Sequence, residues 1–199
     1  PVRAGRFFVY CSSYQGPVPA SAHGLQIDAS LAFGTGEHET THGCLWMLSH
    51  LAKRRVFSRM LDMGCGTGIL SAAMAKNWKG QVLAADIDPN AVRITRQNAA
   101  RNGVKQYIRA VESNGYKSRM VLRHAPYDLI VSNILAEPLV RFAKDLRNNL
   151  AEGGVAVLSG LLTRQENRVL SAHRMQGLYL CGRLRHNGWS VLVLRRRVG

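Results

Sequence analysis

LDMGCGTGIL occupies residues 61–70 and VLAAD occupies residues 82–86, and these two segments decide the fold. The first predicts a buried strand that passes through a glycine turn into a helix, and the second predicts a strand that ends in Asp86. Glycines let the backbone of the turn approach a ligand closely, and an acid at the end of the next strand can accept hydrogen bonds from both hydroxyls of a ribose. The pair therefore indicates a doubly wound sheet that holds an adenosine-bearing cofactor.

Strand and helix patterns alternate along most of the chain. They predict strands at 59–63, 81–87, 106–111, 127–133 and 154–160, and helices at 41–53, 68–77, 89–102, 136–150 and 163–175. Two further extended runs, 178–185 and 189–194, are separated by His186-Asn187-Gly188, and a short Asn-Gly connection predicts an antiparallel hairpin. We expect an α/β fold with a doubly wound, mostly parallel seven-stranded sheet that ends in this hairpin.

Composition indicates one main domain. At 199 residues, of which 46% are hydrophobic, the chain can bury one substantial core. Glycines and prolines surround one short apolar patch, residues 7–10, near the start of the chain. We therefore expect residues 1–30 to be a lead-in or linker segment and residues 31–199 to form the domain that carries the cofactor site.

The chain is strongly basic, with 27 Lys and Arg against 12 Asp and Glu and a formal charge of +15. This charge favours an anionic partner, such as RNA, a ribosome or an acidic protein, although a basic solvated surface is the alternative interpretation. The four cysteines form no CxxC pair, which fits reduced thiols in a cytosolic protein. No apolar run approaches the ~20 residues needed to span a bilayer, and no signal pattern opens the chain, so we expect a cytoplasmic protein without a membrane partner.

The glycine turn has the spacing GxGxG, rather than the GxGxxG of nicotinamide and flavin enzymes. A dinucleotide places a pyrophosphate at the helix N-terminus, where Asp62 would repel it. S-adenosylmethionine instead presents a zwitterionic methionine tail, and Asp62 can receive its ammonium group directly or through water. The alternative is that Asp62 binds only the amides of the glycine loop and that Gly68 only lets the helix pack on the sheet.

Two more strand ends supply candidate site residues. Asp86 is predicted to accept hydrogen bonds from the ribose, whereas Asp88, just before Pro89, is predicted to be the N-cap of the next helix. Asn133 ends strand 127–133 at the carboxyl edge of the sheet, where open sheets bind ligands. Its amide oxygen can accept a hydrogen bond from an N–H group of an attacking amine. The alternative is that the residue simply ends the strand and caps the next helix.

Residues 38–42 read HETTH and match the HExxH pattern of zinc proteases letter for letter. A metalloprotease needs this segment in mid-helix and a third ligand downstream, whereas here it follows a glycine turn and contains capping threonines. We therefore expect no metal, and interpret the segment as a loop that closes over the cofactor, with Thr41 reaching it.

The chain resembles the ribosomal protein methyltransferases of the PrmA type, which are class I S-adenosylmethionine-dependent enzymes that modify amino groups of ribosomal protein L11. The matching segments are LAFGTGEHETT at 31–41, LDMGCGTGIL at 61–70, ADIDPNAV at 85–92, NAARNGV at 98–104 and DLIVSNILAEPL at 128–139. All class I methyltransferases share the glycine motif, whereas AFGTGEHETT together with SNILAEP is specific to this family. The C-terminal hairpin also resembles the class I methyltransferase fold.

The resemblance implies that S-adenosylmethionine is the cofactor. It implies that Thr41, Gly64, Gly66, Asp86 and Asn133 contact the cofactor and that Asn133 is also the catalytic residue that orients the amine. It implies a ribosomal protein as substrate, free or in the ribosome, with lysine side chains or an α-amine as acceptors. Family members carry a separate N-terminal domain that grips this substrate, whereas here only residues 1–30 stand before the core.

Two alternatives remain open from the sequence. The same fold can methylate RNA or a small molecule, and the basic charge allows contact with nucleic acid. Relatives that methylate nucleobase amino groups usually have two prolines and an aromatic residue after the strand-end Asn or Asp, and Ile134-Leu135 supply none of them. A module that binds S-adenosylmethionine without catalysis is the alternative from another class.

Overall fold

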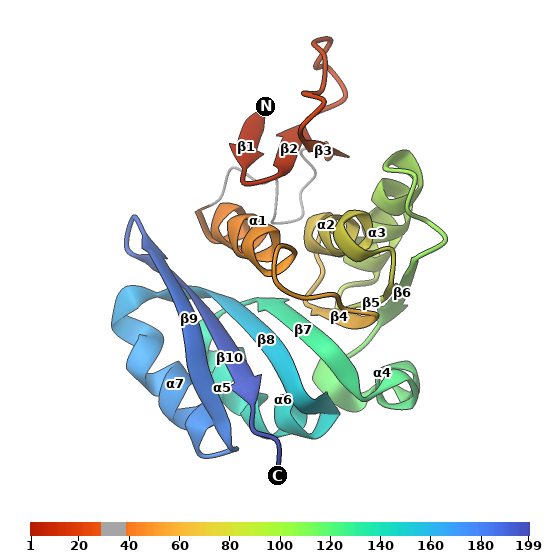
Figure 1. Ribbon diagram of the computed structural model, residues 1–199. Helices are drawn as coiled ribbons and strands as arrows, with labels where there is room; N and C mark the ends of the chain where they lie inside the picture. Colours follow the sequence, from red (N-terminus) through yellow and green to blue (C-terminus); the bar gives the residue numbers. More distant parts are fainter. Residues whose placement is uncertain (29–38) are drawn as a thin grey trace.

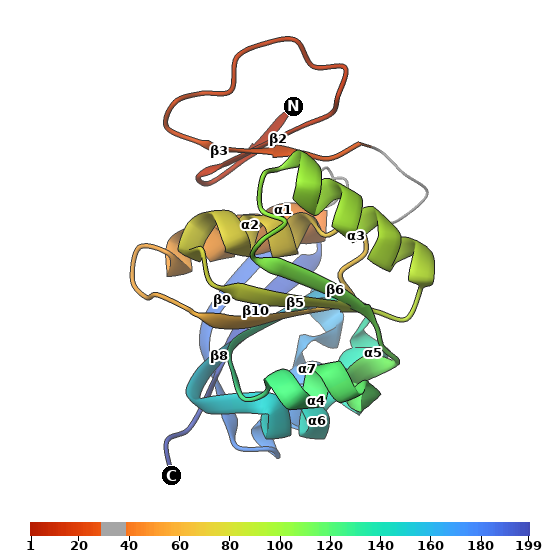
Figure 2. The same ribbon diagram turned by 90° about the vertical axis from the view of Figure 1, so that its right-hand side faces the viewer.

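A central sheet lies between two layers of helices in the computed structural model, which describes residues 1–28 and 39–199 (Figure 1, Figure 2). Its strands run in the order β6-β5-β4-β7-β8-β10-β9. Their bounds are β4 (Arg59–Met63), β5 (Gln81–Asp86), β6 (Ile108–Glu112), β7 (Tyr127–Asn133), β8 (Leu150–Leu162), β9 (Leu178–His186) and β10 (Trp189–Arg196). The sheet is parallel except for β10, which pairs antiparallel with both β8 and β9, so the expected fold class is confirmed.

Helices cover both faces of the sheet (Figure 2). One layer contains α1 (Glu39–Leu51), α2 (Ile69–Trp78) and α3 (Pro89–Arg101), and the other contains α4 (Arg119–His124), α5 (Ala136–Arg141), α6 (Ala143–Asn149) and α7 (Glu166–Arg174). Successive strand residues point to opposite faces, so Leu129 and Val131 of β7 pack in the core of the first layer and Ile130 packs in the core of the second. Burial on both faces explains the continuous apolar runs of the central strands.

The hairpin at the end of the chain was predicted correctly. Asn187 and Gly188 have φ angles of 48° and 79°, the left-handed geometry of a two-residue turn whose twist matches the flanking strands. Asn tolerates this conformation better than most side chains and glycine adopts it freely, which is why this dipeptide makes the turn.

Three differences from the predicted elements have local causes. The helix expected at 136–150 is divided into α5 and α6 at Phe142, which leaves helical geometry (φ −87°, ψ 1°) while its ring packs edge-on against Tyr116 at 5.9 Å. The strand expected at 154–160 extends over 150–162 because β7 and β10 pair with it beyond the apolar run. The 3-10 helix η1 (Gly115–Lys117) and the six-residue α4 were not predicted, since a helix this short shows no periodicity.

The first 28 residues form a second, three-stranded sheet in the order β1 (Val2–Ala4), β2 (Phe7–Tyr10) and β3 (His23–Gln26). This sheet lies over α1 and α2 (Figure 1), and Phe7 and Leu25 are fully buried in the same core as those helices. The side chain of Asn102 donates to the carbonyl oxygen of Gln26 and accepts from its amide, at 2.9 and 2.8 Å. The segment is therefore packed on the main domain, and a boundary at residue 30 stays a prediction.

Candidate active site

Three neighbouring strands, β5, β4 and β7, bring their carboxyl ends together at the candidate site. From β4 the chain continues to β5 and β6 on one side of β4, and it then returns to form β7 on the other side of β4. The strand order therefore reverses between β4 and β7. Ligands of open α/β sheets bind at such a reversal, outside the carboxyl ends of the strands. Asp86 and Asn133 are the last residues of β5 and β7, and Gly64 follows directly after β4.

The glycine turn after β4 has a backbone that only glycine adopts without strain. Gly64, Gly66 and Gly68 have φ angles of 79°, 53° and 76°. A Cβ atom on Gly64 would also overlap the side chain of Ile134, the residue after Asn133. The amides of Gly64 and Cys65 both donate to the carbonyl of Ala85, at 2.7 and 3.1 Å, which fixes the turn against the end of β5.

Asp86 joins the turn to the start of α3. Its Oδ2 accepts from the amide of Gly66 at 2.9 Å and its Oδ1 accepts from the amide of Asp88 at 3.0 Å. A carboxylate has about four acceptor positions, so these two bonds leave room for the two hydroxyls of a ribose. Asp88 is the N-cap of α3 as predicted, because its Oδ1 accepts from the amide of Asn90 at 2.8 Å.

Asp62 is a buried carboxyl group that is short of one partner. The residue is 1% exposed, its Oδ2 accepts from the hydroxyl of Ser71 at 2.6 Å, and its Oδ1 has no hydrogen-bond partner among the described residues. Desolvation raises its pKa to about 7, and the nearby charge of Asp86 acts in the same direction. A buried carboxylate without a counter-ion is costly, and a ligand's ammonium group, directly or through water, would supply the missing donor and charge.

Asn133 is bonded to the candidate cofactor residue Thr41. The amide nitrogen Nδ2 of Asn133 donates to Oγ1 of Thr41 at 3.2 Å, and the Thr41 side chain is 1% exposed at the start of α1. This bond uses the nitrogen end of the amide, and it leaves Oδ1 buried without a partner in the described part of the chain. The structure therefore brings Thr41, Gly64, Gly66, Asp86 and Asn133 to one edge of the sheet.

Supporting residues that the sequence did not single out hold the turn from behind. Thr95 donates from Oγ1 to the carbonyl of Gly66 at 3.1 Å, and Asn98 donates from Nδ2 to the carbonyl of Thr67 at 2.9 Å. Both side chains are buried on the inner face of α3. Polar residues on the apolar face of this amphipathic helix were the available signal, because a buried polar group must find a partner.

Glu39 and His42 of the HETTH segment both contact other parts of the protein. Glu39 accepts from Nδ2 of Asn187 at 2.7 Å and lies 3.1 Å from Nε2 of His186, so it joins α1 to the tip of the β9–β10 hairpin. Nε2 of His42 lies 3.1 Å from the carbonyl oxygen of Arg3. His38 lies outside the described residues, as does most of the loop expected to close over the cofactor. Across residues 1–28 and 39–199 no cluster of three potential metal ligands is present.

The model of the ribosomal protein L11 methyltransferase (PrmA) family matches residues 1–197. The chain belongs to this family. Proteins named ribosomal protein L11 methyltransferase from Caulobacter sp. and Bradyrhizobium diazoefficiens are 44% and 43% identical to it over 196 residues. The aligned region is 98% of this chain and 67% and 66% of theirs, so the chain spans about two thirds of the length of these PrmA relatives.

Solved structures agree with the assignment. The crystal structure of a ribosomal protein L11 methylase from Lactobacillus delbrueckii subsp. bulgaricus has a TM-score of 0.84 and 28% identity, and the match covers 97% of this chain and 96% of that one. A methyltransferase from Pyrococcus furiosus, at a TM-score of 0.65 and 19% identity over 77% of this chain and 81% of that one, shares the fold. PrmA proteins are S-adenosylmethionine-dependent methyltransferases, so the predicted family, enzyme class and cofactor are confirmed. No described helix is long and apolar enough to cross a membrane.

Proposed function

We propose that this chain transfers methyl groups from S-adenosylmethionine to lysine side chains or the α-amine of ribosomal protein L11. The observation that supports the acceptor type is the buried Oδ1 of Asn133, which has no partner among the described residues. An amine substrate has N–H groups that can donate a hydrogen bond to this oxygen, whereas a carbonyl or carboxylate substrate has none. The name shared by the PrmA relatives supports the choice of L11.

Four groups at the sheet edge are proposed to hold the cofactor. Asp86 would accept from the ribose hydroxyls, while its bonds to Gly66 and Asp88 keep the carboxylate in place. Asp62 would receive the ammonium group of the methionine tail, which matches its buried, unpartnered oxygen. Gly64 and Gly66, with their positive φ angles, would shape the turn so that its backbone lies against the cofactor. When bound, S-adenosylmethionine supplies a methyl group made electrophilic by its sulfonium.

Asn133 would align the acceptor amine without acting as a base. The bond from its Nδ2 to Thr41 fixes the orientation of the amide, so that Oδ1 is the end left to accept from the substrate N–H. An amide oxygen cannot remove a proton at neutral pH, so the amine must lose its proton before or on binding. The contribution of the site is therefore alignment, which can lower a barrier by several kcal/mol.

The proposed setting follows from the proposed substrate. Ribosomal proteins are made and assembled in the cytoplasm, so we place the protein there and propose that it acts on L11, free or within the ribosome. The formal charge of +15 favours association with ribosomal particles, which are anionic.

The decisive experiment incubates the protein with methyl-labelled S-adenosylmethionine and either purified L11, intact ribosomes or protein-free ribosomal RNA. We expect label on L11, located by mass spectrometry on lysine side chains or the α-amine. The Asn133→Ala variant is the matched control, because it should retain the fold and the label should fall sharply. Label found only in RNA would defeat the proposal in favour of RNA methylation, and cofactor binding without label on any acceptor would favour a binding module.

A further inference from the structure

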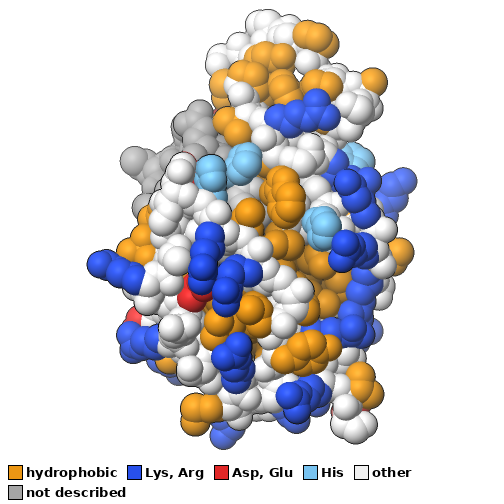
Figure 3. Space-filling view, turned by 60° about the vertical axis from the view of Figure 1, so that its left-hand side comes forward, with side chains coloured by type: hydrophobic (Ala, Val, Ile, Leu, Met, Phe, Trp, Pro, Cys, Tyr) orange, Lys and Arg blue, Asp and Glu red, His pale blue; other side chains and the backbone are white. Residues whose placement is uncertain are grey.

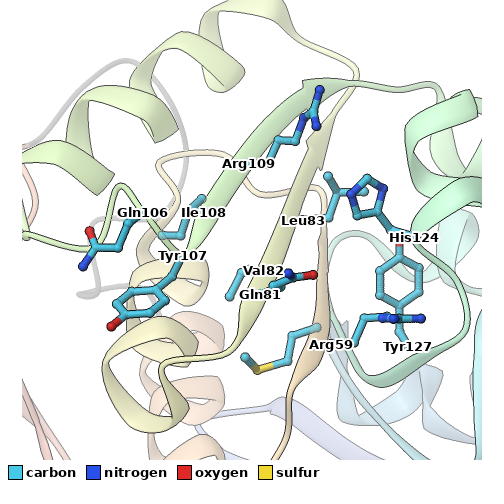
Figure 4. Close-up of a pocket in the computed structure, with 11 residues that line it drawn as sticks. Arg59, Gln81, Val82, Leu83, Gln106, Tyr107, Ile108, Arg109, His124 and Tyr127 are labelled. Carbon is cyan, nitrogen blue, oxygen red and sulfur yellow. The ribbon is translucent and has the colours of Figure 1, made fainter.

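A cavity of about 240 Å³ opens at the edge of the sheet opposite the glycine turn. It lies where β4, β5 and β6 begin, beside the end of α4 (Figure 4). The lining residues on which the argument depends are Arg59, Gln81, Leu83, Arg109 and His124. None of them belongs to the site described above.

The short α4 leaves this part of the sheet open. It is six residues long and ends at His124, so it covers less of the β5–β6 surface than the longer helices cover elsewhere. Leu83 pairs with Arg109 across β5 and β6, and Arg59 pairs with Gln81 across β4 and β5. Figure 4 shows Arg59, Leu83 and His124 together on one side of these strands. The result is a hollow with a buried apolar floor and a polar rim.

The rim carries two uncommitted guanidinium groups. Arg59 and Arg109 are exposed, and neither side chain makes a hydrogen bond or ion pair with another described residue. Arg96 and Arg101 on the adjacent α3 are engaged, since Arg96 donates to the carbonyl of Ala110 at 2.8 Å and Arg101 pairs with Asp28 at 3.0 Å. The free arginines are therefore available to an anion.

Few carboxylates are placed to compete with a bound anion for the arginines of this cavity. No carboxylate is among the described residues that line the cavity. The nearest one along the chain, Asp128, accepts from the amides of Ser58 and Arg59 and from the Ser58 hydroxyl at 2.8–3.1 Å, so both of its oxygens already have partners. Nδ1 of His124 lies 2.8 Å from the carbonyl oxygen of Met120, which leaves Nε2 as a further polar atom of this lining residue.

We propose that this cavity binds one unpaired nucleotide of a single-stranded RNA, with Arg59 and Arg109 on the flanking phosphates. Guanidinium groups form paired hydrogen bonds with phosphate oxygens. The planar guanidinium group of arginine and the imidazole ring of histidine can also stack on exposed bases. The amide of Gln81 can read the edge of a base, and a hollow of this size can take one unstacked base, which a duplex does not offer.

The surroundings extend the contact beyond one nucleotide. Arg123 of α4 is exposed and directly precedes the lining residue His124, so positive charge continues next to the cavity along the path of the RNA. Basic residues also spread over the face in Figure 3, where Asp and Glu side chains are sparse. RNA bound here would leave the methyl-transfer edge open, because the two sites lie at opposite ends of the same strands.

The test is binding of a fluorescein-labelled single-stranded RNA of about 12 nucleotides, followed by anisotropy at several salt concentrations. The variant is Arg59→Ala with Arg109→Ala, and the matched control is Lys144→Ala with Arg174→Ala, which removes the same charge from exposed positions on α6 and α7. We expect the first variant to bind RNA at least ~10-fold more weakly, with a salt slope smaller by about 1.4 for the two lost phosphate contacts, and the control to change the affinity less than ~2-fold.

Other outcomes would overturn the proposal. Equal losses in the two variants would mean diffuse attraction by net charge. Adenosine monophosphate that binds as tightly as the strand would indicate a mononucleotide site, and tighter binding of duplex RNA or of polyglutamate would indicate a different partner. Both variants should keep cofactor binding and methyl transfer to free L11, which separates failure of this proposal from failure of the proposed function.

Discussion

Asn133 at the end of β7 donates a hydrogen bond from Nδ2 to Oγ1 of Thr41 in the first turn of α1, across 3.2 Å and 92 positions of sequence. Both side chains are largely shielded, and the oxygen of the Asn133 amide is left as a buried acceptor. The bond therefore orients the amide, because it leaves the oxygen end free to face the place where the substrate amine would bind.

Removing the Thr41 hydroxyl should misorient this amide. We expect Thr41→Val to lower kcat about 10-fold, since the fixed orientation of Asn133 is lost, and Asn133→Ala to lower it about 100-fold. Neither variant should weaken cofactor binding as much as it slows transfer. Steady-state kinetics with L11, together with calorimetry of S-adenosylmethionine binding, give the two numbers.

Thr41→Ser is the conservative control, because it keeps the hydroxyl that accepts from Asn133. Its kcat should stay within about 2-fold of the parent. A kcat in Thr41→Ser as low as in Thr41→Val would argue that the methyl group of Thr41 matters and that the hydrogen bond does not.

Asp86 and Asp88 should separate cofactor binding from helix capping. Asp86→Ala removes an acceptor that holds Gly66 and is proposed to bind the ribose, so we expect S-adenosylmethionine to bind about 10- to 100-fold more weakly. Asp88→Ala removes only the N-cap bond to Asn90 and should cost about 1 kcal/mol of unfolding free energy with nearly unchanged affinity. Calorimetry and urea unfolding of both variants make the comparison, and equal affinity loss in the two would contradict the assigned roles.

Asp62 predicts a pH dependence near neutrality. Its pKa in the folded protein is raised by desolvation to about 7, above its ordinary value of 3.8, so the folded state holds the proton more tightly than the unfolded chain. Its contribution to stability is therefore greatest below about pH 4 and declines as the pH rises toward about 7. Urea unfolding of the cofactor-free protein should show this decline, and Asp62→Asn should flatten it.

Cofactor affinity should depend on pH in the opposite sense. The ammonium group of S-adenosylmethionine favours the ionised carboxyl group, so affinity should rise by up to about 10-fold between about pH 6 and pH 7.5. In Asp62→Asn the affinity should be lower and nearly constant over the same range. Calorimetry at the two pH values checks this, and an unchanged rise in the variant would remove Asp62 from the explanation.

The parts of the site that lie close in sequence were predictable, because their geometry is set by local chemistry. The turn from Gly64 to Gly68 needs φ angles that glycine prefers, and the Asp88-Pro89 pair marks the start of a helix. The pairing of Asn133 with Thr41 was not predictable as a contact, since it depends on how α1 packs against the sheet. Phe142 divides a continuous helical pattern because of a tertiary contact with Tyr116, which periodicity does not contain.

Buried charge was also hidden from the sequence. Glu166 begins α7 and would ordinarily be taken as an exposed acid of a first helical turn, yet it is 2% exposed. Its carboxylate accepts from Nε and Nη2 of Arg185 at 2.8 and 2.7 Å and from Oγ of Ser190 at 2.6 Å. The acid thus joins α7 to both strands of the hairpin, whose tip in turn contacts α1 through Glu39.

Glu166→Gln should loosen this junction in a pH-dependent way. The hydrogen bonds from Arg185 lower the pKa of Glu166 to about 2, below its ordinary value of 4.5, so the carboxylate stabilises the folded state above about pH 4.5 and the gain is lost as the pH falls toward 2. Because glutamine keeps the shape but not the charge, we expect the variant to lose about 2–3 kcal/mol of unfolding free energy near pH 7. The difference from the parent should shrink near pH 3, measured by urea unfolding at both values. A difference that stays the same at both pH values would show that packing, rather than the charge of Glu166, holds the hairpin to α7.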